Sequence, residues 1–350
     1  MKCISKEKTA ALESLLDRGG KACIAVHTHP DGDALGSGIA LKRYLRERRG
    51  IQASLLLPDP APATMAFLCN GIDIIAASED PAAAKAAVDG CSILFLLDAN
   101  AFNRTEGLAG LLSASKVKKV LIDHHLNPDT ASFDLVFSEQ EVSSTCELLF
   151  WLLRTLEHDD TRSIPDGSLY ALMTGMTTDT NNFANSVWPG TLAMARELLL
   201  AGVDRDDILL HLYNEGTENR LMAWADMIRN HLRIRPDGIA FMVMTRAMSD
   251  AYGIEEGDNE GLVNVPLRMK KVKLSIFARE EEGFFRISIR AKRGWSANGM
   301  AMEYFHGGGH ELAAGGKVFV PGDIPDASGM ENYLGGIAAR FLQNQGKNQL

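Results

Sequence analysis

Two histidines and two aspartates crowd into the segment "HTHPDGD", residues 27 to 33. Imidazole nitrogens and carboxylate oxygens are ligands that Mn²⁺ and Mg²⁺ accept, and pairs of such ions hydrolyse phosphate esters. His27, Asp31 and Asp33 are therefore candidate metal ligands. Because proline, aspartate and glycine also favour tight turns, a purely structural turn is the alternative.

Two later segments carry the same residue types. Asp98 ends the apolar run of "LFLLDAN", where it is either a ligand bridging two metal ions or a cap of the following helix. Asp123, His124 and His125 stand together in "VLIDHHLN". An acid beside two histidines can combine a metal ligand, a group that orients it and a substrate contact. The structural alternative for this segment is weaker, because adjacent histidines are uncommon.

A fourth segment, "TGMTTDTNNF", places Asp179 near the end of a predicted helix, where a polar C-terminal turn is the alternative. With it, the chain offers six ligand-type side chains: His27, Asp31, Asp33, Asp98, His124 and Asp179. Such a set suits two ions about 3.5–4 Å apart that hold a hydroxide in line with a phosphorus atom. The prediction is hydrolysis of a phosphate ester without a covalent intermediate.

The C-terminal third offers groups that bind anions. In "FHGGGHELAAGG", the glycines Gly307, Gly308 and Gly309 would let backbone amides approach a phosphate, with His310 beside it, unless the run is only a flexible turn. Residues 268 to 293 hold nine Lys or Arg and three Glu, a net +6, which leaves −15 for the rest of a chain of net charge −9. The net charge argues against stable duplex DNA binding. The basic segment indicates either a localised anionic ligand or a solvated basic face on a hairpin.

The elements that must position these groups can be read from the same sequence. Apolar segments such as residues 21–28, 91–99 and 117–125 alternate with helical patterns, which predicts a parallel sheet covered on both faces. The first three motifs then fall at carboxyl ends of strands, where such sheets bind ligands. Residues 141 to 230 read as helical, and a mixed α/β pattern with a hairpin around "EEEG" follows from residue 239.

The bulk composition bounds the remaining possibilities. The apolar runs are far too short to span a bilayer, and the charged N-terminal segment lacks the apolar core of a secretory signal. The five cysteines are scattered without a CxxC pair, which is typical of reduced thiols. We therefore expect a cytoplasmic protein without membrane association.

The motifs "HPDGDALGS", "LLDAN", "IDHH", "TTDT" and "GGGHELAAGG" occur in one order between about residues 15 and 345. In this the chain resembles the DHH superfamily of phosphoesterases with a DHH-associated C-terminal domain. Within it, the chain looks most like the NrnA-type enzymes, oligoribonucleases that also dephosphorylate 3′-phosphoadenosine 5′-phosphate (pAp). The resemblance implies a catalytic domain over residues 1–215, a helical linker over 216–236 and a substrate-binding domain over 237–350, with the active site in the cleft between domains.

The resemblance also implies a role for each candidate residue. The first ion would be held by His27, Asp31 and Asp98, and the second by Asp33, Asp98, His124 and Asp179, so that Asp98 bridges the two. His125 would lie near the scissile phosphate, with Asp123 supporting the histidines. The substrate would be held by Arg290, by His310 with Gly307, Gly308 and Gly309, and by Arg268 and Arg279 facing the metals.

The expected activity is Mn²⁺-dependent hydrolysis, with Mg²⁺ or Co²⁺ as alternative metals. Very short single-stranded oligonucleotides such as pApA would yield nucleoside 5′-monophosphates, and pAp would yield AMP. A homodimer is one expectation for the assembly. The alternatives are a cyclic-dinucleotide phosphodiesterase, a RecJ-like single-strand exonuclease, an exopolyphosphatase, and a nucleotide-binding regulator without catalysis, which need not retain two ions.

Overall fold

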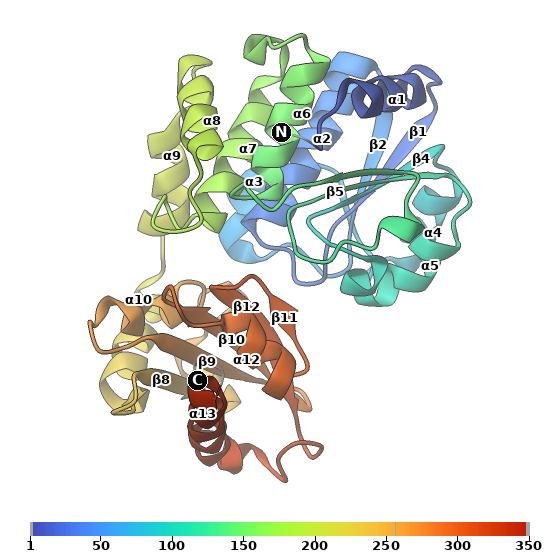
Figure 1. The fold of residues 1–350 in the computed structure, drawn as a ribbon. Helices are drawn as coiled ribbons and strands as arrows, with labels where there is room; N and C mark the ends of the chain where they lie inside the picture. The colour runs from blue at the N-terminus through green and yellow to red at the C-terminus, as the bar shows by residue number, and fades with distance from the viewer. Residues whose placement is uncertain (1–2, 256, 348–350) are drawn as a thin grey trace. The chain divides into compact units, whose positions relative to one another are not determined.

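The structure is a computed structural model that describes residues 3–255 and 257–347. The chain divides into two compact units, residues 1–215 and 216–350 (Figure 1). Each unit contains its own six-stranded sheet. None of the described helices is long and apolar enough to cross a membrane.

The first unit is built on a parallel sheet of strand order β3-β2-β1-β4-β5-β6. Its strands are β1 (Lys21–Ala25), β2 (Gln52–Leu57), β3 (Ile74–Ala76), β4 (Ile93–Leu97), β5 (Lys118–Asp123) and β6 (Leu135–Ser138). The predicted parallel sheet is confirmed, and β6 is a short edge strand that the sequence pattern did not indicate. The chain order reverses between β1 and β4, which is the point where doubly wound sheets form a ligand crevice.

Helices cover both faces of this sheet, because alternate residues of each strand point to opposite sides. Ile24 lies in the core formed with α1 (Lys6–Asp17), α2 (Gly32–Arg49), α6 (Thr145–Leu156) and α7 (Asp166–Asp179). Its neighbours Cys23 and Ala25 lie in the opposite core, under α4 (Pro81–Asp89), η2 (Phe102–Leu108) and α5 (Ala109–Ala114). The smaller segments η1 (Ala63–Met65), α3 (Ala66–Cys69), η3 (Thr130–Ser132) and η4 (Thr161–Ser163) join these elements.

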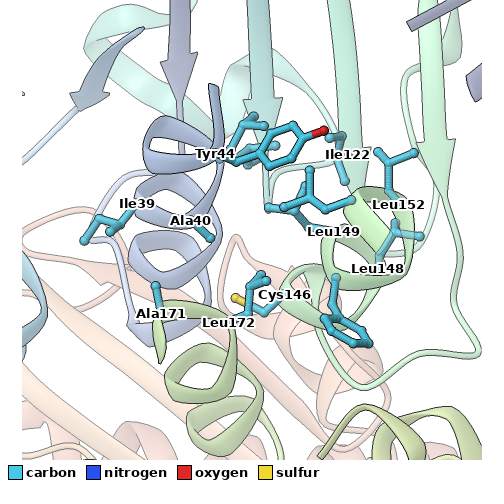
Figure 2. Close-up of a cluster of buried hydrophobic side chains, with 14 of the residues drawn as sticks. Ile39, Ala40, Tyr44, Ile122, Cys146, Leu148, Leu149, Leu152, Ala171 and Leu172 are labelled. Carbon is cyan, nitrogen blue, oxygen red and sulfur yellow. The ribbon is translucent and has the colours of Figure 1, made fainter. Parts of the chain in front are cut away.

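The small residues after the first motif let α2 and α7 approach closely. A Cβ on Gly32 would lie 2.5 Å from the Thr178 hydroxyl, and one on Gly175 would lie 2.3 Å from Cys146 Sγ. Figure 2 shows the core beside this contact, where Tyr44, Leu149 and Leu172 gather from α2, α6 and α7. Gly36 faces the backbone of α7 directly, because a Cβ there would lie 2.6 Å from the carbonyl of Ala171.

The helical stretch ends with α8 (Pro189–Leu200), α9 (Arg205–Leu209) and the π-helical turn η5 (Leu210–Asn214). Residues 216–236 contain α10 (Glu218–Asp226), the π-helical turn η6 (Met227–His231) and β7 (Arg233–Ile234). These pack within the second unit: Met227 is buried with Met242 and Phe277, and Trp224 Nε1 donates a 3.0 Å hydrogen bond to the carbonyl of Asp258.

The second unit is built on a mixed sheet of order β11-β12-β10-β9-β8-β7. Its longer strands are β8 (Ile239–Met244), β9 (Leu274–Glu281), β10 (Phe284–Ala291) and β12 (Ala313–Phe319), with β11 (Gly308–Gly309) at the edge. The predicted hairpin is confirmed as the antiparallel pair β9–β10. Helices α12 (Ala297–Tyr304) and α13 (Met330–Lys347) bury one face, and α11 (Arg246–Tyr252), η7 (Leu262–Arg268) and η8 (Ala327–Gly329) complete the unit.

Candidate metal centre

The first motif forms the turn between β1 and α2, and its acids have structural as well as chemical uses. Asp31 is the N-cap of α2, because its Oδ1 accepts hydrogen bonds from the backbone amides of Asp33 at 3.0 Å and Ala34 at 3.1 Å. His27 Nε2 lies 3.8 Å from the same oxygen. The turn expected as the alternative is therefore real, and it brings His27 and Asp31 together. His29, in the same turn, points elsewhere, with Nδ1 3.4 Å from Asp59.

Asp98 lies at the centre of the acidic and histidine groups. Its Oδ2 is 3.3 Å from His27 Nε2 and its Oδ1 is 3.6 Å from His124 Nε2, so the two oxygens face different histidines. Asp98 does not cap the next helix, whose N-cap is Ala101. Its backbone is left-handed, with φ of 54°. A residue other than glycine adopts this backbone conformation only where its surroundings impose it, and such strained residues concentrate at functional sites.

The second group gathers three side chains from distant segments. His124 Nε2 lies 3.3 Å from Asp179 Oδ2 and 3.8 Å from Asp33 Oδ2. Asp33 starts α2, His124 follows β5, and Asp179 ends α7. The polar C-terminal turn of α7 thus directs Asp179 toward the end of the sheet.

The N-terminus of α6 binds the acids and was missed by the sequence reasoning. The backbone amides of Thr145 and Cys146 donate to Asp33 at 2.7 and 2.9 Å, and the Thr145 hydroxyl donates to Asp98 Oδ1 at 3.0 Å. A signal was present, because "STCE" has the form of a helix start and the Ser144 hydroxyl accepts from the amide of Glu147 at 3.0 Å. The positive end of a helix dipole stabilises the fully buried Asp33 carboxylate.

His125 and Asp123 form a separate pair beside this group. Asp123 is fully buried, and both of its carboxylate oxygens contact His125. Oδ1 lies 2.7 Å from Nδ1 of the ring, and Oδ2 accepts a hydrogen bond from the backbone amide at 3.1 Å. This contact fixes the ring, which leaves Nε2 directed away from Asp123. His125 Nδ1 is also 3.7 Å from Asp98 Oδ1, so the pair borders the acidic group.

The close packing of acids and histidines shifts their pKa values in opposite directions. Burial, reinforced by the charge of Asp98, raises the pKa of Asp33 well above its usual range. Burial acts against the charged form of His27, but Asp31 and Asp98 outweigh it and raise the pKa of His27 to about 10. Burial would also raise the pKa of Asp98, yet His27, His125 and His124 hold it well below its usual range. The carboxylates thus need positive charge, which protons or cations can supply.

The donor chemistry of these side chains fits divalent cations. Several ligand groups have atoms within 4.8 Å of one another, among them His27 with Asp31 and Asp98, Asp33 with His124 and Asp179, and Asp98 with Asp123 and His125. His27 Nδ1 lies 2.8 Å from the carbonyl of Thr28, so Nδ1 keeps its proton in the neutral ring, and Nε2, which faces the acids, is the nitrogen that can bind a metal once deprotonated. Carboxylate oxygens with two imidazoles suit Mn²⁺ or Mg²⁺ better than a sulfur-dependent zinc site.

The candidate anion-binding loop of the second unit has packing reasons for two of its three glycines. A Cβ on Gly307 would lie 1.9 Å from the carbonyl of Gly315, and Gly309 has φ of +150°. At Gly308 the nearest atom would be Asn298 Oδ1, at 3.6 Å. His310 turns the chain into β12, because its amide donates to the carbonyl of Ala313 at 2.7 Å. Gly308 is thus the glycine of this loop whose backbone has open space beside it.

The three candidate arginines of the second unit lie on three different elements. Arg279 on β9 and Arg290 on β10 share one face of the sheet by their register. Arg290 is half-buried, and its guanidinium donates to the carbonyl of Ile289 at 3.0 Å. Arg268 is exposed and ends η7, which is a separate element.

Comparison with protein families gives two matches along the chain. Residues 21–176 match the model of the DHH family, N-terminal domain, and residues 239–330 match the DHHA1 domain. The first match contains three of the four ligand-bearing segments, and the second contains the glycine loop and all three candidate arginines.

Individual relatives extend over most of the chain. It is 25% identical to the bifunctional oligoribonuclease and PAP phosphatase NrnA of Bacillus subtilis, over 84% of this chain and 88% of the relative. It is 28% identical to NrnA of Thermus thermophilus, over 85% of this chain and 84% of that one. The crystal structure of an exopolyphosphatase-related protein from Bacteroides fragilis superposes with a TM-score of 0.87 and 28% identity, covering 98% of both chains.

Proposed function

This chain belongs to the DHH family of metal-dependent phosphoesterases, and from that premise we propose that it hydrolyses very short oligonucleotides. The substrates are linear dinucleotides such as pApA, which yield nucleoside 5′-monophosphates, and pAp, which yields AMP. One observation carries the proposal: the two oxygens of Asp98 face two histidines, each of which has its own acidic partners.

The ligand set divides around Asp98. His27 and Asp31 would hold one ion with Asp98 Oδ2, and Asp33, His124 and Asp179 would hold a second with Asp98 Oδ1. Two bound Mn²⁺ ions, or Mg²⁺ or Co²⁺ in their place, would lower the pKa of a water molecule and polarise the phosphoryl oxygens. The α6 N-terminus keeps Asp33 in position before and after substrate binds, because its two amide bonds are independent of any ligand.

His125 would contact the scissile phosphate through Nε2. The buried Asp123 holds the opposite nitrogen, so the ring is oriented before substrate arrives and keeps one tautomer. His125 is the catalytic contact in this proposal, and Asp123 is a positioning residue.

The two units divide the work. Residues 1–215 supply the metal ligands, and residues 237–350 bind the nucleotide through Arg290 and the loop of Gly307, Gly308, Gly309 and His310. The open position at Gly308 supports this assignment, because backbone amides approach a phosphate best where no Cβ intervenes. All five cysteines are free thiols, which supports a cytoplasmic location.

A substrate panel tests the proposal. Purified protein with Mn²⁺ is given pAp, pApA, a cyclic dinucleotide, a long single-stranded RNA and polyphosphate, and the products are separated by chromatography. We expect the highest kcat/KM on pApA and pAp. A preference for polyphosphate would favour an exopolyphosphatase, the activity after which the Bacteroides fragilis relative is named. A preference for long strands would favour a RecJ-like exonuclease, and either preference overturns the assignment.

A further inference from the structure

A fully buried carboxylate that the proposed function does not use lies in the first turn of α6. The Oε2 atom of Glu147 accepts three hydrogen bonds. The backbone amide and the hydroxyl of Ser143 donate to it at 2.8 and 2.7 Å, and the hydroxyl of Thr191 donates at 2.7 Å. Thr191 belongs to α8, which packs beside α6 (Figure 1). The carboxylate therefore joins the start of α6 to a helix that begins more than one turn of sequence away.

The second oxygen of Glu147 is buried and has no hydrogen-bond partner in the part of the chain that the structure describes. The same holds there for Trp151 Nε1. A Cβ on Gly190 would lie 2.6 Å from Glu147 Oε1 and 3.7 Å from Trp151 Nε1, so both atoms face one glycine of α8. A buried acid with an unpaired oxygen costs stability, whereas a leucine of similar size would not. Stability alone therefore does not account for Glu147.

The chain that Glu147 restrains leads directly to the metal ligands. Ser143 comes two residues before Thr145. The Thr145 amide donates to Asp33 at 2.7 Å, and its hydroxyl donates to Asp98 Oδ1 at 3.0 Å. In a capping box, the acid at this helix position binds the amide of the N-cap residue. Glu147 binds the residue before the N-cap instead, so it fixes the chain where it enters α6.

The contacts of Thr145 fall on one side of the ligand set. Asp33 lies in the second ligand group, and the Asp98 oxygen that Thr145 contacts is the one that faces His124. The other oxygen of Asp98 faces the ligands of the first ion. A change at Glu147 should therefore act on the second ion and leave the first ion in place.

We propose that Glu147 is a positioning residue for the second metal ion. By fixing the start of α6, it directs the donors of Thr145 and Cys146 toward Asp33 before any ion binds. Glu147 contacts neither the ion nor the substrate in this proposal, and it acts through these residues. The inference rests on the proposed function, because it deepens the assignment of the two-ion site. Outer residues that orient metal ligands change metal affinity by about 10–100-fold when they are substituted.

Three substitutions test the positioning role. Glu147→Ala removes all three hydrogen bonds, whereas Glu147→Gln keeps an oxygen that can accept them. Gly190→Ala places a Cβ 2.6 Å from Glu147 Oε1, so it displaces the acid without removing it. Because this variant keeps Glu147, the test does not depend on whether Glu147→Ala folds. Glu141→Ala, at an exposed acid of the same segment, is the matched control.

The main measurement is the number of Mn²⁺ ions bound per chain without substrate. Electron paramagnetic resonance of the unbound ion gives this number over a range of free Mn²⁺, and we expect wild type to bind two ions. Glu147→Ala and Gly190→Ala should weaken the second ion at least about tenfold and leave the first unchanged, with Glu147→Gln within about threefold of wild type. Excess Mn²⁺ should restore most of the lost pApA turnover, which it would not do for a misfolded protein.

The outcomes separate this inference from the proposed function. If the variants lower Tm but bind both ions as wild type does, or if both ions weaken equally, the positioning role is overturned. A wild type that binds a single ion overturns it as well. If wild type binds two ions and the variants lose the second, yet wild type hydrolyses neither pApA nor pAp, the positioning role stands and the proposed function fails.

Discussion

The two units place the charged side chains of their candidate sites in opposite environments. In the first, Asp33, Asp98 and Asp123 are almost completely buried, and each has hydrogen-bond donors or histidines within contact distance. In the second, Arg286, Arg290 and Lys317 lie half-exposed on one face of a sheet. The first arrangement is costly to build and depends on every member, because a buried charge without a partner destabilises the protein.

The difference separates chemistry from recognition. Buried ligands act as a unit, so loss of one should affect every substrate by a large factor. Half-exposed cations act through screened charge and should affect substrates by modest, additive factors that depend on length and salt. Substitutions in both environments test this separation, beginning with the change that should have the largest effect.

The largest effect is expected at Asp98. Asp98→Asn removes the carboxylate whose oxygens face both His27 and His124, so turnover of pAp, pApA and longer strands should all fall by about 10³-fold or more, the equivalent of several kcal/mol. Steady-state kinetics and elemental analysis measure activity and bound metal together. Asp89→Asn, at an exposed position of α4, is the matched control and should behave as wild type. Near-normal turnover in Asp98→Asn would refute the shared ligand.

A smaller uniform effect is expected at Asp123. Asp123→Asn weakens the hold on His125 Nδ1 without removing a metal ligand, so kcat should fall about 10–100-fold on every substrate while metal content is retained. The pH dependence of kcat should also change, which a purely structural defect would not produce. Asp134→Asn, at an exposed acid after β5, is the control. A loss confined to one substrate length would contradict the division between the units.

Metal affinity should depend on pH. With a pKa raised to about 10, His27 carries a proton at pH 7 in the absence of metal, and a ligating imidazole must be neutral. Binding of Mn²⁺ therefore releases a proton, and the apparent affinity should rise by up to about tenfold per pH unit below that pKa. Titration calorimetry in two buffers of different ionisation enthalpy measures the release. His158→Gln, at an exposed turn, should leave the proton release unchanged. If the affinity for Mn²⁺ does not change between pH 6 and pH 8, His27 is not a ligand.

The smallest effects distinguish two kinds of glycine. Gly175→Ala places a Cβ 2.3 Å from Cys146 Sγ and 3.0 Å from Asp33 Cα, so it should destabilise the first unit by about 1–3 kcal/mol and lower Tm by roughly 2–12 °C. Gly308→Ala has room and should keep Tm while raising KM for pAp. Thermal melts and kinetics measure both. Gly110→Ala, with nothing within 4 Å of its Cβ, is the neutral control. If Gly175→Ala and Gly308→Ala lower Tm equally, the two glycines do not differ in packing as stated.

Much of the fold was predictable because it depends on local patterns. The alternation of strands and helices, the hairpin β9–β10 and the caps at Asp31 and Ser144 are encoded within a few residues of each other. Strand β6 was missed because it has only four residues at the sheet edge, too few for a clear alternation. The proximity of Arg279, Arg286 and Lys317 was not predictable, because these residues are brought side by side only by strand register.

The sequence by itself determined which chemistry was available: acids and histidines after apolar strands, small residues where a helix must pack closely, and glycines before a turn. Only the tertiary structure decided how these groups combine. The order β1-β4-β5 brings Asp98 between His27 and His124, and the N-terminus of α6 reaches Asp33 across 112 residues of chain. The physical reason is that strand order and register follow from burying the whole apolar surface of the sheet at once, which no local segment specifies.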